Sequence, residues 1–112
     1  MTDYEFGDVV LITFPFTNQT TDKRRPALVV SSTAYHRNRP DLILMAITSR
    51  LRPSPSFGET TVDQWETAGL IKPSFIKPIF ATVEKSIVIR KMGRLSDQDQ
   101  QNLRKSIPTI LG

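Results

Sequence analysis

One segment constrains the fold of this chain more than any other. LILMAIT, residues 42–48, is continuously apolar up to its final threonine. Strands with one face in water alternate apolar and polar side chains, whereas strands buried on both faces are apolar throughout. The turn-forming sequence RNRPD, residues 37–41, directly precedes the run. We therefore expect residues 42–48 to form a strand in the centre of a sheet.

Two further strands are expected before this run. The first opens after GD at residues 7–8 and continues as VVLITFPF to a turn at Pro15, because β-branched and aromatic residues favour strands. The polar segment NQTTDK, residues 18–23, is expected to be a loop. The second strand is ALVVS, and we expect Pro26 at its start rather than inside it, because proline donates no backbone hydrogen bond.

The chain after residue 48 alternates turns with extended segments. RPSPSFG, residues 52–58, holds two prolines and a glycine and indicates a long mobile loop. A short strand, ETTV, and a turn that ends at Gly69 are expected next. SFIKPIFATVEK, residues 74–85, indicates a strand that Pro78 places at a sheet edge or in a bulge. IVIRKMGRL then continues in extended conformation to Gly93.

The C-terminal segment has the features of a helix. Ser96 is an expected N-cap, and Asp97 and Asp99 are acidic residues in the first turn, where they favour a helix N-terminus. Pro108 is expected to stop the helix. Several short strands with one terminal helix predict a mainly β fold, either a small curled β-barrel or a strongly twisted sheet that carries a helix. At 112 residues the chain is expected to be a single domain, 1–112.

Composition limits the chemistry that this chain can perform. It has no cysteine and one histidine, His36, so disulfides, thiolate nucleophiles and a two-histidine acid/base pair are excluded, and no metal site or cofactor is expected. The net charge of +4 weakly favours anionic partners such as nucleic acid. The sequence contains no signal peptide and no apolar run long enough to span a bilayer. We expect a cytoplasmic protein without a membrane partner.

Individual residues have ordinary explanations beside functional ones. Arg25 before a strand is by itself more often a surface charge, and Thr48 at a strand end is more often an ordinary strand-forming residue. His36 is interpreted as a solvated turn residue without a role. Trp65 is either a core or interface anchor or a side chain that stacks on a base.

The order of several motifs resembles one known family. GDVVLITFPF, KRRPALVVSS, LMAITS, GLIKPSFIKP and MGRLS before a helix resemble the MazF/PemK family of bacterial toxin endoribonucleases, from about Gly7 to the terminal helix. The resemblance implies a small SH3-like β-barrel, CcdB/MazF-like, with a short C-terminal α-helix, paired as a homodimer. It also implies a type II toxin-antitoxin system, whose toxin cleaves single-stranded RNA, including mRNA, at specific sequences without a metal and so inhibits growth.

The family also implies partners and site residues. A cognate antitoxin silences the toxin by occupying its RNA groove, and DNA is contacted only indirectly through the antitoxin. The two catalytic positions of the family, the arginine before the proline of RP and the threonine of the I-T step, fall on Arg25 and Thr48. The residues expected to bind RNA are Phe16, Thr17, Lys23, Arg24, Ser49, Arg50 and Lys77. Relatives often carry arginine where this chain has Ala81, so the contacts of that arginine do not carry over.

These two catalytic positions suit RNA chemistry. RNA carries its own nucleophile, the 2′-hydroxyl, and cleavage by that group leaves a 2′,3′-cyclic phosphate and a 5′-hydroxyl. An arginine beside the scissile phosphate stabilises the negative charge of the transition state, and the Thr48 hydroxyl can bond a nonbridging oxygen. The general base is not assigned, because either Arg25 also transfers protons or a base comes from elsewhere.

A second class of function stays open. A toxin branch of this fold poisons DNA gyrase without hydrolysis, so a non-catalytic toxin that binds nucleic acid or protein is the alternative. The presence of both Arg25 and Thr48 distinguishes the RNA-cleaving toxin from the non-catalytic one, because a toxin that only binds does not need these two residues.

Overall fold

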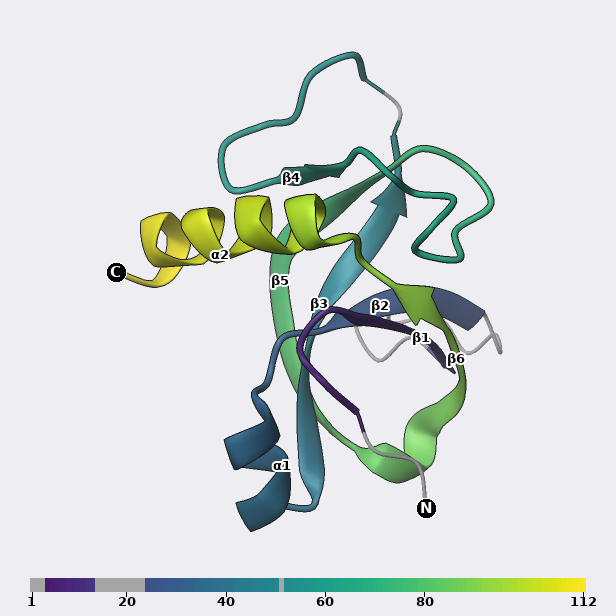
Figure 1. Ribbon diagram of the computed structural model, residues 1–112, viewed down its shortest axis with the longest axis vertical. Coiled ribbons are helices and arrows are strands. Elements are labelled where there is room, and N and C mark those ends of the chain that lie inside the picture. The colour runs from purple at the N-terminus through teal and green to yellow at the C-terminus, as the bar shows by residue number, and fades with distance from the viewer. Residues whose placement is uncertain (1–3, 14–23, 51) are drawn as a thin grey trace.

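The computed structural model describes residues 4–13, 24–50 and 52–112 (Figure 1). Within these ranges six strands form one sheet in the order β4-β5-β3-β2-β1-β6, and neighbouring strands run antiparallel. The strands are β1 (Asp8–Thr13), β2 (Arg24–Val29), β3 (Asp41–Ser49), β4 (Thr60–Val62), β5 (Ser74–Glu84) and β6 (Val88–Arg94). The helices are α1 (Thr33–Asn38), the 3-10 turn η1 (Lys85–Ile87) and α2 (Asp97–Leu111).

The sheet curls strongly, with α2 alongside β4 and α1 toward the opposite end (Figure 1). The predicted mainly β fold with a C-terminal helix is confirmed. No helix in the described ranges is long and apolar enough to cross a bilayer.

Alternate residues of β3 enter two separate cores. Met45 and Ile47 pack into one core with α2, whereas Leu42 and Leu44 pack into the other. Because successive side chains of a strand point to opposite faces, the two cores lie on the two faces of the sheet. β3 lies between β5 and β2. The prediction of a central strand at residues 42–48 is therefore confirmed.

The two prolines of the sheet occupy positions where backbone pairing is incomplete. Pro26 lies inside β2, opposite Leu11 of β1, so the prediction that it precedes the strand is wrong. β2 pairs with β3 only from Ala27 onward, and the missing N–H of proline is tolerated in a stretch with a single neighbour. Pro78 lies where the β3·β5 register shifts and beyond the part of β5 that β4 covers, which confirms the predicted edge or bulge.

The helices differ from expectation at two points. Ser96 caps α2 by accepting a hydrogen bond from the Asp99 N–H at 3.2 Å, as predicted. Pro108 does not stop the helix, because a proline removes only the bond of its own nitrogen, and the Gly112 N–H still donates to the Pro108 carbonyl at 2.9 Å. Helix α1 was not anticipated, and Ser32 caps it through the Tyr35 N–H.

His36 is half-buried on α1 and is not a solvated turn residue. Its Nδ1 lies 2.7 Å from the Tyr4 carbonyl, and its Nε2 lies 2.5 Å from the Ser31 hydroxyl. The Ser31 hydroxyl also accepts from the Ile43 N–H. The single histidine therefore ties the N-terminal segment to α1 and β3, which is a structural role.

The GD motif at residues 7–8 and the GRL motif at residues 93–95 are in contact in the folded chain. Leu95 donates its N–H to the Gly7 carbonyl at 2.9 Å. The buried Asp8 carboxylate binds Arg94 at 2.9 Å and Lys91 at 3.1 Å. These contacts lock β6 to β1, so the cavity-facing residues of β6 lie across β1 from those of β2.

Candidate functional site

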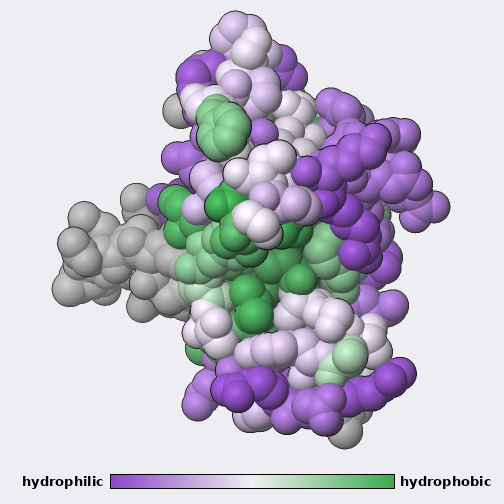
Figure 2. Space-filling model, turned by 90° about the vertical axis from the view of Figure 1, so that its left-hand side faces the viewer, coloured by the Kyte–Doolittle hydropathy of each residue, from purple (hydrophilic) through white to green (hydrophobic). Residues whose placement is uncertain are grey.

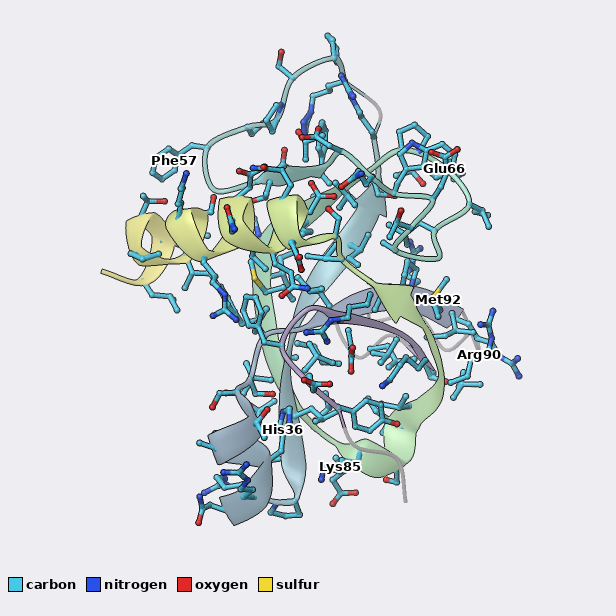
Figure 3. All side chains as sticks on the ribbon, viewed as in Figure 1. His36, Phe57, Glu66, Lys85, Arg90 and Met92 are labelled. Carbon is cyan, nitrogen blue, oxygen red and sulfur yellow. The ribbon has the colours of Figure 1, made fainter. Side chains whose placement is uncertain are left out.

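A cavity of about 340 Å³ opens where five segments of the chain converge. Its walls come from β1, β2, β3, β6 and the segment that leads into β5. The lining residues are Leu11, Arg24, Arg25, Pro26, Ile47, Thr48, Ser49, Leu70, Ile71, Lys72, Ser74, Arg90 and Met92. Arg90 and Met92, labelled in Figure 3, mark the β6 wall.

The strand register brings Arg25 and Thr48 together. Ala27 of β2 pairs with Ala46 of β3. Arg25 lies two residues before Ala27 on β2, and Thr48 lies two residues after Ala46 on β3. Paired residues point to the same face of a sheet, as do residues two apart on one strand, so Arg25 and Thr48 share a face, and both line the cavity. A guanidinium and a hydroxyl can therefore bind the same small anion.

The described residues that line the cavity carry positive charge and include no carboxylate. Among the described residues that line it, four are basic and none is acidic; the basic residues are Arg24, Arg25, Lys72 and Arg90. Several basic residues elsewhere have carboxylate partners: Arg39 binds Asp41, Arg52 binds Glu59, and Lys91 and Arg94 share Asp8. Arg25 is half-buried, and its Nε is shielded from solvent. A cationic cavity with low-dielectric walls attracts anions.

The other predicted site residues divide into three groups. Arg24 and Ser49 line the cavity beside Arg25 and Thr48. Arg50 and Lys77 are not among the lining residues. Phe16, Thr17 and Lys23 lie outside the described residues, so the structure says nothing of them.

Arg50 and Arg52 organise the loop that follows β3. Arg50 donates from Nη2 to the Pro53 carbonyl and from Nε to the Arg52 carbonyl. Arg52 donates to both carboxylate oxygens of Glu59, and both guanidinium groups lie over the Phe75 ring. These two cations thus hold residues 52–59 in place.

Sequence reasoning missed Lys72, Arg90 and Met92 as cavity residues. Lys72 lies in GLIKPS and Arg90 in IVIRKM, where each is one exposed cation among many. The strand register was the missing signal, because it places Arg90 opposite Leu11, which in turn lies opposite Pro26.

A buried carboxylate holds the segment that carries Lys72. Asp99 is fully buried, and its two oxygens accept from the N–H groups of Asp63 and Gln64 at 3.1 and 2.9 Å. The expectation that Asp99 merely suits a helix N-terminus is therefore incomplete. The same turn approaches β6 so closely that a Cβ on Gly93 would lie 2.5 Å from the Ala68 carbonyl oxygen. Together these contacts fix one wall of the cavity.

The donor set does not resemble a metal centre. In residues 4–13, 24–50 and 52–112, no group of three histidine, cysteine or acidic side chains is arranged to hold a metal ion. The arrangement that is present, guanidinium, ammonium and hydroxyl groups around an open cavity, suits phosphate oxygens.

Comparisons with known proteins agree on one family and one fold. The family model described as the PemK-like, MazF-like toxin of type II toxin-antitoxin systems matches residues 5–111. An endoribonuclease from Mycobacterial species, solved with its cognate antitoxin, superposes with a TM-score of 0.78 at 15% identity, over 98% of this chain and 96% of that one.

Two further solved structures have the same fold. Mycobacterium tuberculosis toxin MazF-mt6 gives a TM-score of 0.72 at 20% identity, over 92% of this chain and 94% of that one. MazF from Deinococcus radiodurans gives a TM-score of 0.72 at 21% identity, over 98% of this chain and 99% of that one. At such identities these structures establish the fold alone. No curated protein matches the sequence.

Proposed function

Because the chain belongs to the PemK-like, MazF-like toxins of type II toxin-antitoxin systems, a family of endoribonuclease toxins, we propose that it cleaves single-stranded RNA at specific sequences without a metal. Its substrates include mRNA in the cytoplasm, and their loss inhibits growth. The observation that carries this proposal is that Arg25 and Thr48 line one cavity whose described lining residues include no carboxylate.

The proposed reaction uses the 2′-hydroxyl of the RNA as the nucleophile. The O2′ oxygen loses its proton and attacks the adjacent phosphorus, and the bond from phosphorus to O5′ breaks as that oxygen gains a proton. Arg25 donates to the nonbridging oxygens, where negative charge develops, and Thr48 holds one of them for in-line attack. The products are a 2′,3′-cyclic phosphate and a 5′-hydroxyl.

The proton transfers in this reaction do not fall to His36. Both of its ring nitrogens are engaged, with Tyr4 and Ser31, and it lies on α1, away from Arg90 and Met92 (Figure 3). Arginine stays protonated in proteins and therefore serves as a donor of hydrogen bonds. The base in this proposal is left to a further group or to solvent.

The proposed working unit is a homodimer that a cognate antitoxin inhibits. Figure 2 shows hydrophobic side chains gathered at the centre of the face that looks left in Figure 1. Beyond Ile76, no strand of the described residues pairs with the outer side of β5, and Ile79 and Leu111 are 40% and 64% exposed. A second copy would cover this surface. An antitoxin segment with acidic and apolar residues would compete with RNA for the basic cavity.

Incubation of the purified protein with a long single-stranded RNA in excess chelator tests the proposed function. We expect defined fragments whose 5′ ends accept phosphate from a kinase directly, because they carry hydroxyl groups. Thr48→Val removes the hydroxyl at nearly constant volume and should slow cleavage strongly, while Arg37→Ala, which removes an exposed cation from α1, should not. Activity that disappears in chelator and returns with magnesium would overturn the proposal, and intact RNA under every condition would favour the non-catalytic toxin.

A further inference from the structure

Two cations of the cavity stand on opposite sides of the Arg25 and Thr48 pair. Arg90 comes from β6 and Lys72 from the segment that leads into β5. The sheet order β5-β3-β2-β1-β6 therefore arranges the four groups in sequence across the strands as Lys72, Thr48, Arg25 and Arg90.

The position of Arg90 follows from two strand registers. Leu11 of β1 lies opposite Arg90 on one side and opposite Pro26 on the other. Neighbouring strands are about 4.8 Å apart, so the backbone at Arg90 lies roughly 10 Å from that at Pro26. This separation allows the two arginines to bind two different phosphates.

The position of Lys72 follows from the pairing of β3 with β5. Ser74 lies opposite Ser49, and the Arg50 N–H donates to the Pro73 carbonyl at 2.8 Å. Lys72 therefore lies beyond the end of β3, on the side of Thr48 that is remote from β2. Its carbonyl accepts from the Ser74 hydroxyl at 2.9 Å, which fixes the backbone at Lys72, and Lys72 lines the cavity.

Neither cation has a carboxylate partner among the residues that the structure describes. Lys91, the neighbour of Arg90, binds the buried Asp8. Arg90 itself is among the residues that line the cavity. A charge left unneutralised at a basic cavity is available to an anionic ligand.

Each of the two cations also has an apolar neighbour in the lining. Ile71, next to Lys72, is 86% exposed although it lines the cavity, and Met92 lies two residues after Arg90 on β6. A bare inorganic anion gains nothing from such side chains. A nucleotide does, because it joins a phosphate to a base with an apolar face.

We propose that Lys72 and Arg90 bind the two phosphates that flank the scissile one, one on each side, so that the RNA runs across the strands from β5 to β6. This inference rests on the proposed function. Lys72 and Arg90 are then positioning residues, which fix the register of the RNA over Arg25 and Thr48 and take no part in the bond changes. Phosphate contacts of this kind orient a nucleic acid and carry no sequence information.

RNA substrates in which one flanking phosphate is replaced by an uncharged analogue test which phosphate each cation binds. The substrate is an oligonucleotide centred on the mapped cleavage site, made with a methylphosphonate in place of the flanking phosphate on the 5′ side, on the 3′ side or on neither. Lys72→Ala and Arg90→Ala should each raise KM for the unmodified RNA by about tenfold, as expected for the loss of one charged contact, with kcat within about twofold. For each variant, a methylphosphonate on one side of the scissile phosphate should leave KM unchanged, whereas a methylphosphonate on the other side should still raise it. The side that has no effect should differ between the two variants. Lys72→Arg and Arg90→Lys should recover most of the lost affinity.

Binding measured without cleavage separates this inference from the proposed function. On an Arg25→Ala background, each further substitution should reduce the slope of log affinity against log salt by about 0.7, as expected for one phosphate of a single strand, whereas Arg37→Ala should leave it unchanged. If the protein cuts RNA but Lys72→Ala and Arg90→Ala behave like Arg37→Ala, or both respond to the same flanking phosphate, the inference fails alone. If the protein cuts no RNA, the proposed function fails, and the salt slopes still decide whether these cations bind phosphates.

Discussion

At the scale of single residues, the site depends on side chains that are ordinary until the sheet forms. The rest of β2, α1 and most of β3 separate Arg25 from Thr48 along the chain, and the pairing of β2 with β3 brings both residues to one cavity. Arg24 lines the same cavity but is more exposed than Arg25. Neighbouring arginines can therefore differ in role, since a half-buried guanidinium is more fixed in direction than an exposed one.

Arg25→Ala is expected to reduce kcat by a factor of about a hundred to a thousand, as for the loss of one preorganised donor to a transition state. RNA affinity should change little, because three other cavity cations remain. Arg24→Ala should do the reverse and weaken binding with a smaller effect on kcat. Single-turnover rates and fluorescence titrations of both variants measure the difference. An Arg25 variant that kept more than about a tenth of the wild-type rate would move the catalytic role to Arg24.

At the scale of elements, the cavity depends on how the turn before β5 is held. Asp99 lies in the first turn of α2, and its two carboxylate oxygens accept hydrogen bonds from the backbone N–H groups of residues 63 and 64. Gly69 has a φ of 82°, and the turn meets β6 backbone to backbone at Gly93. The segment that follows carries Lys72, so a helix residue on the far side of the turn helps to set the shape of the cavity.

Asp99→Ala is expected to lower the free energy of unfolding by about 2–4 kcal/mol, because two backbone N–H groups lose their acceptors in a buried place. Asp97→Ala is the matched control, since Asp97 is an exposed acid of the same helix turn, and its loss should cost about 0.5 kcal/mol. Urea denaturation followed by circular dichroism gives both values. Equal effects of the two substitutions would show that Asp99 acts only through the helix N-terminus.

At the scale of the whole molecule, the described residues form an exposed apolar surface. Residues 57–58, the outer edge of β5 and the end of α2 come together there, since Gly58 lies against Pro78 and Ile110. Apart from β5, whose Ser74 lines the basic cavity, this surface and the cavity come from different segments of the chain. Assembly through the first therefore leaves the second open to RNA.

Ile79→Asp is expected to convert a homodimer to a monomer, because it places a charge in the centre of the proposed interface. Sedimentation at micromolar concentration should give twice 12.7 kDa for the wild type and 12.7 kDa for the variant. Ile71→Asp is the control: Ile71 is also highly exposed but lines the cavity, so the mass should stay that of a dimer. A wild type that sediments as a fully active 12.7 kDa species would remove both the dimer and this account of the apolar surface.

The sequence by itself determined the features that depend on neighbours along the chain. An unbroken apolar run predicted β3, Ser96 predicted the start of α2, and Pro78 predicted an edge or bulge. The motifs around Arg25 and Thr48 predicted two residues that the structure brings to one cavity. Each of these follows from local hydrogen bonding, side-chain burial or a short motif, which a linear sequence records directly.

Only the tertiary structure decided the features that depend on strand register and on contacts between distant segments. Pro26 lies inside β2 because β2 pairs with β3 only from the next residue onward. Pro108 lies inside α2 because its carbonyl still accepts the hydrogen bond from the Gly112 N–H. His36, Asp99 and Arg90 acquire their positions from partners far away in sequence. A single slip in register would point each strand's side chains to the other face, so no local pattern could have placed Lys72 and Arg90 on the two sides of one cavity.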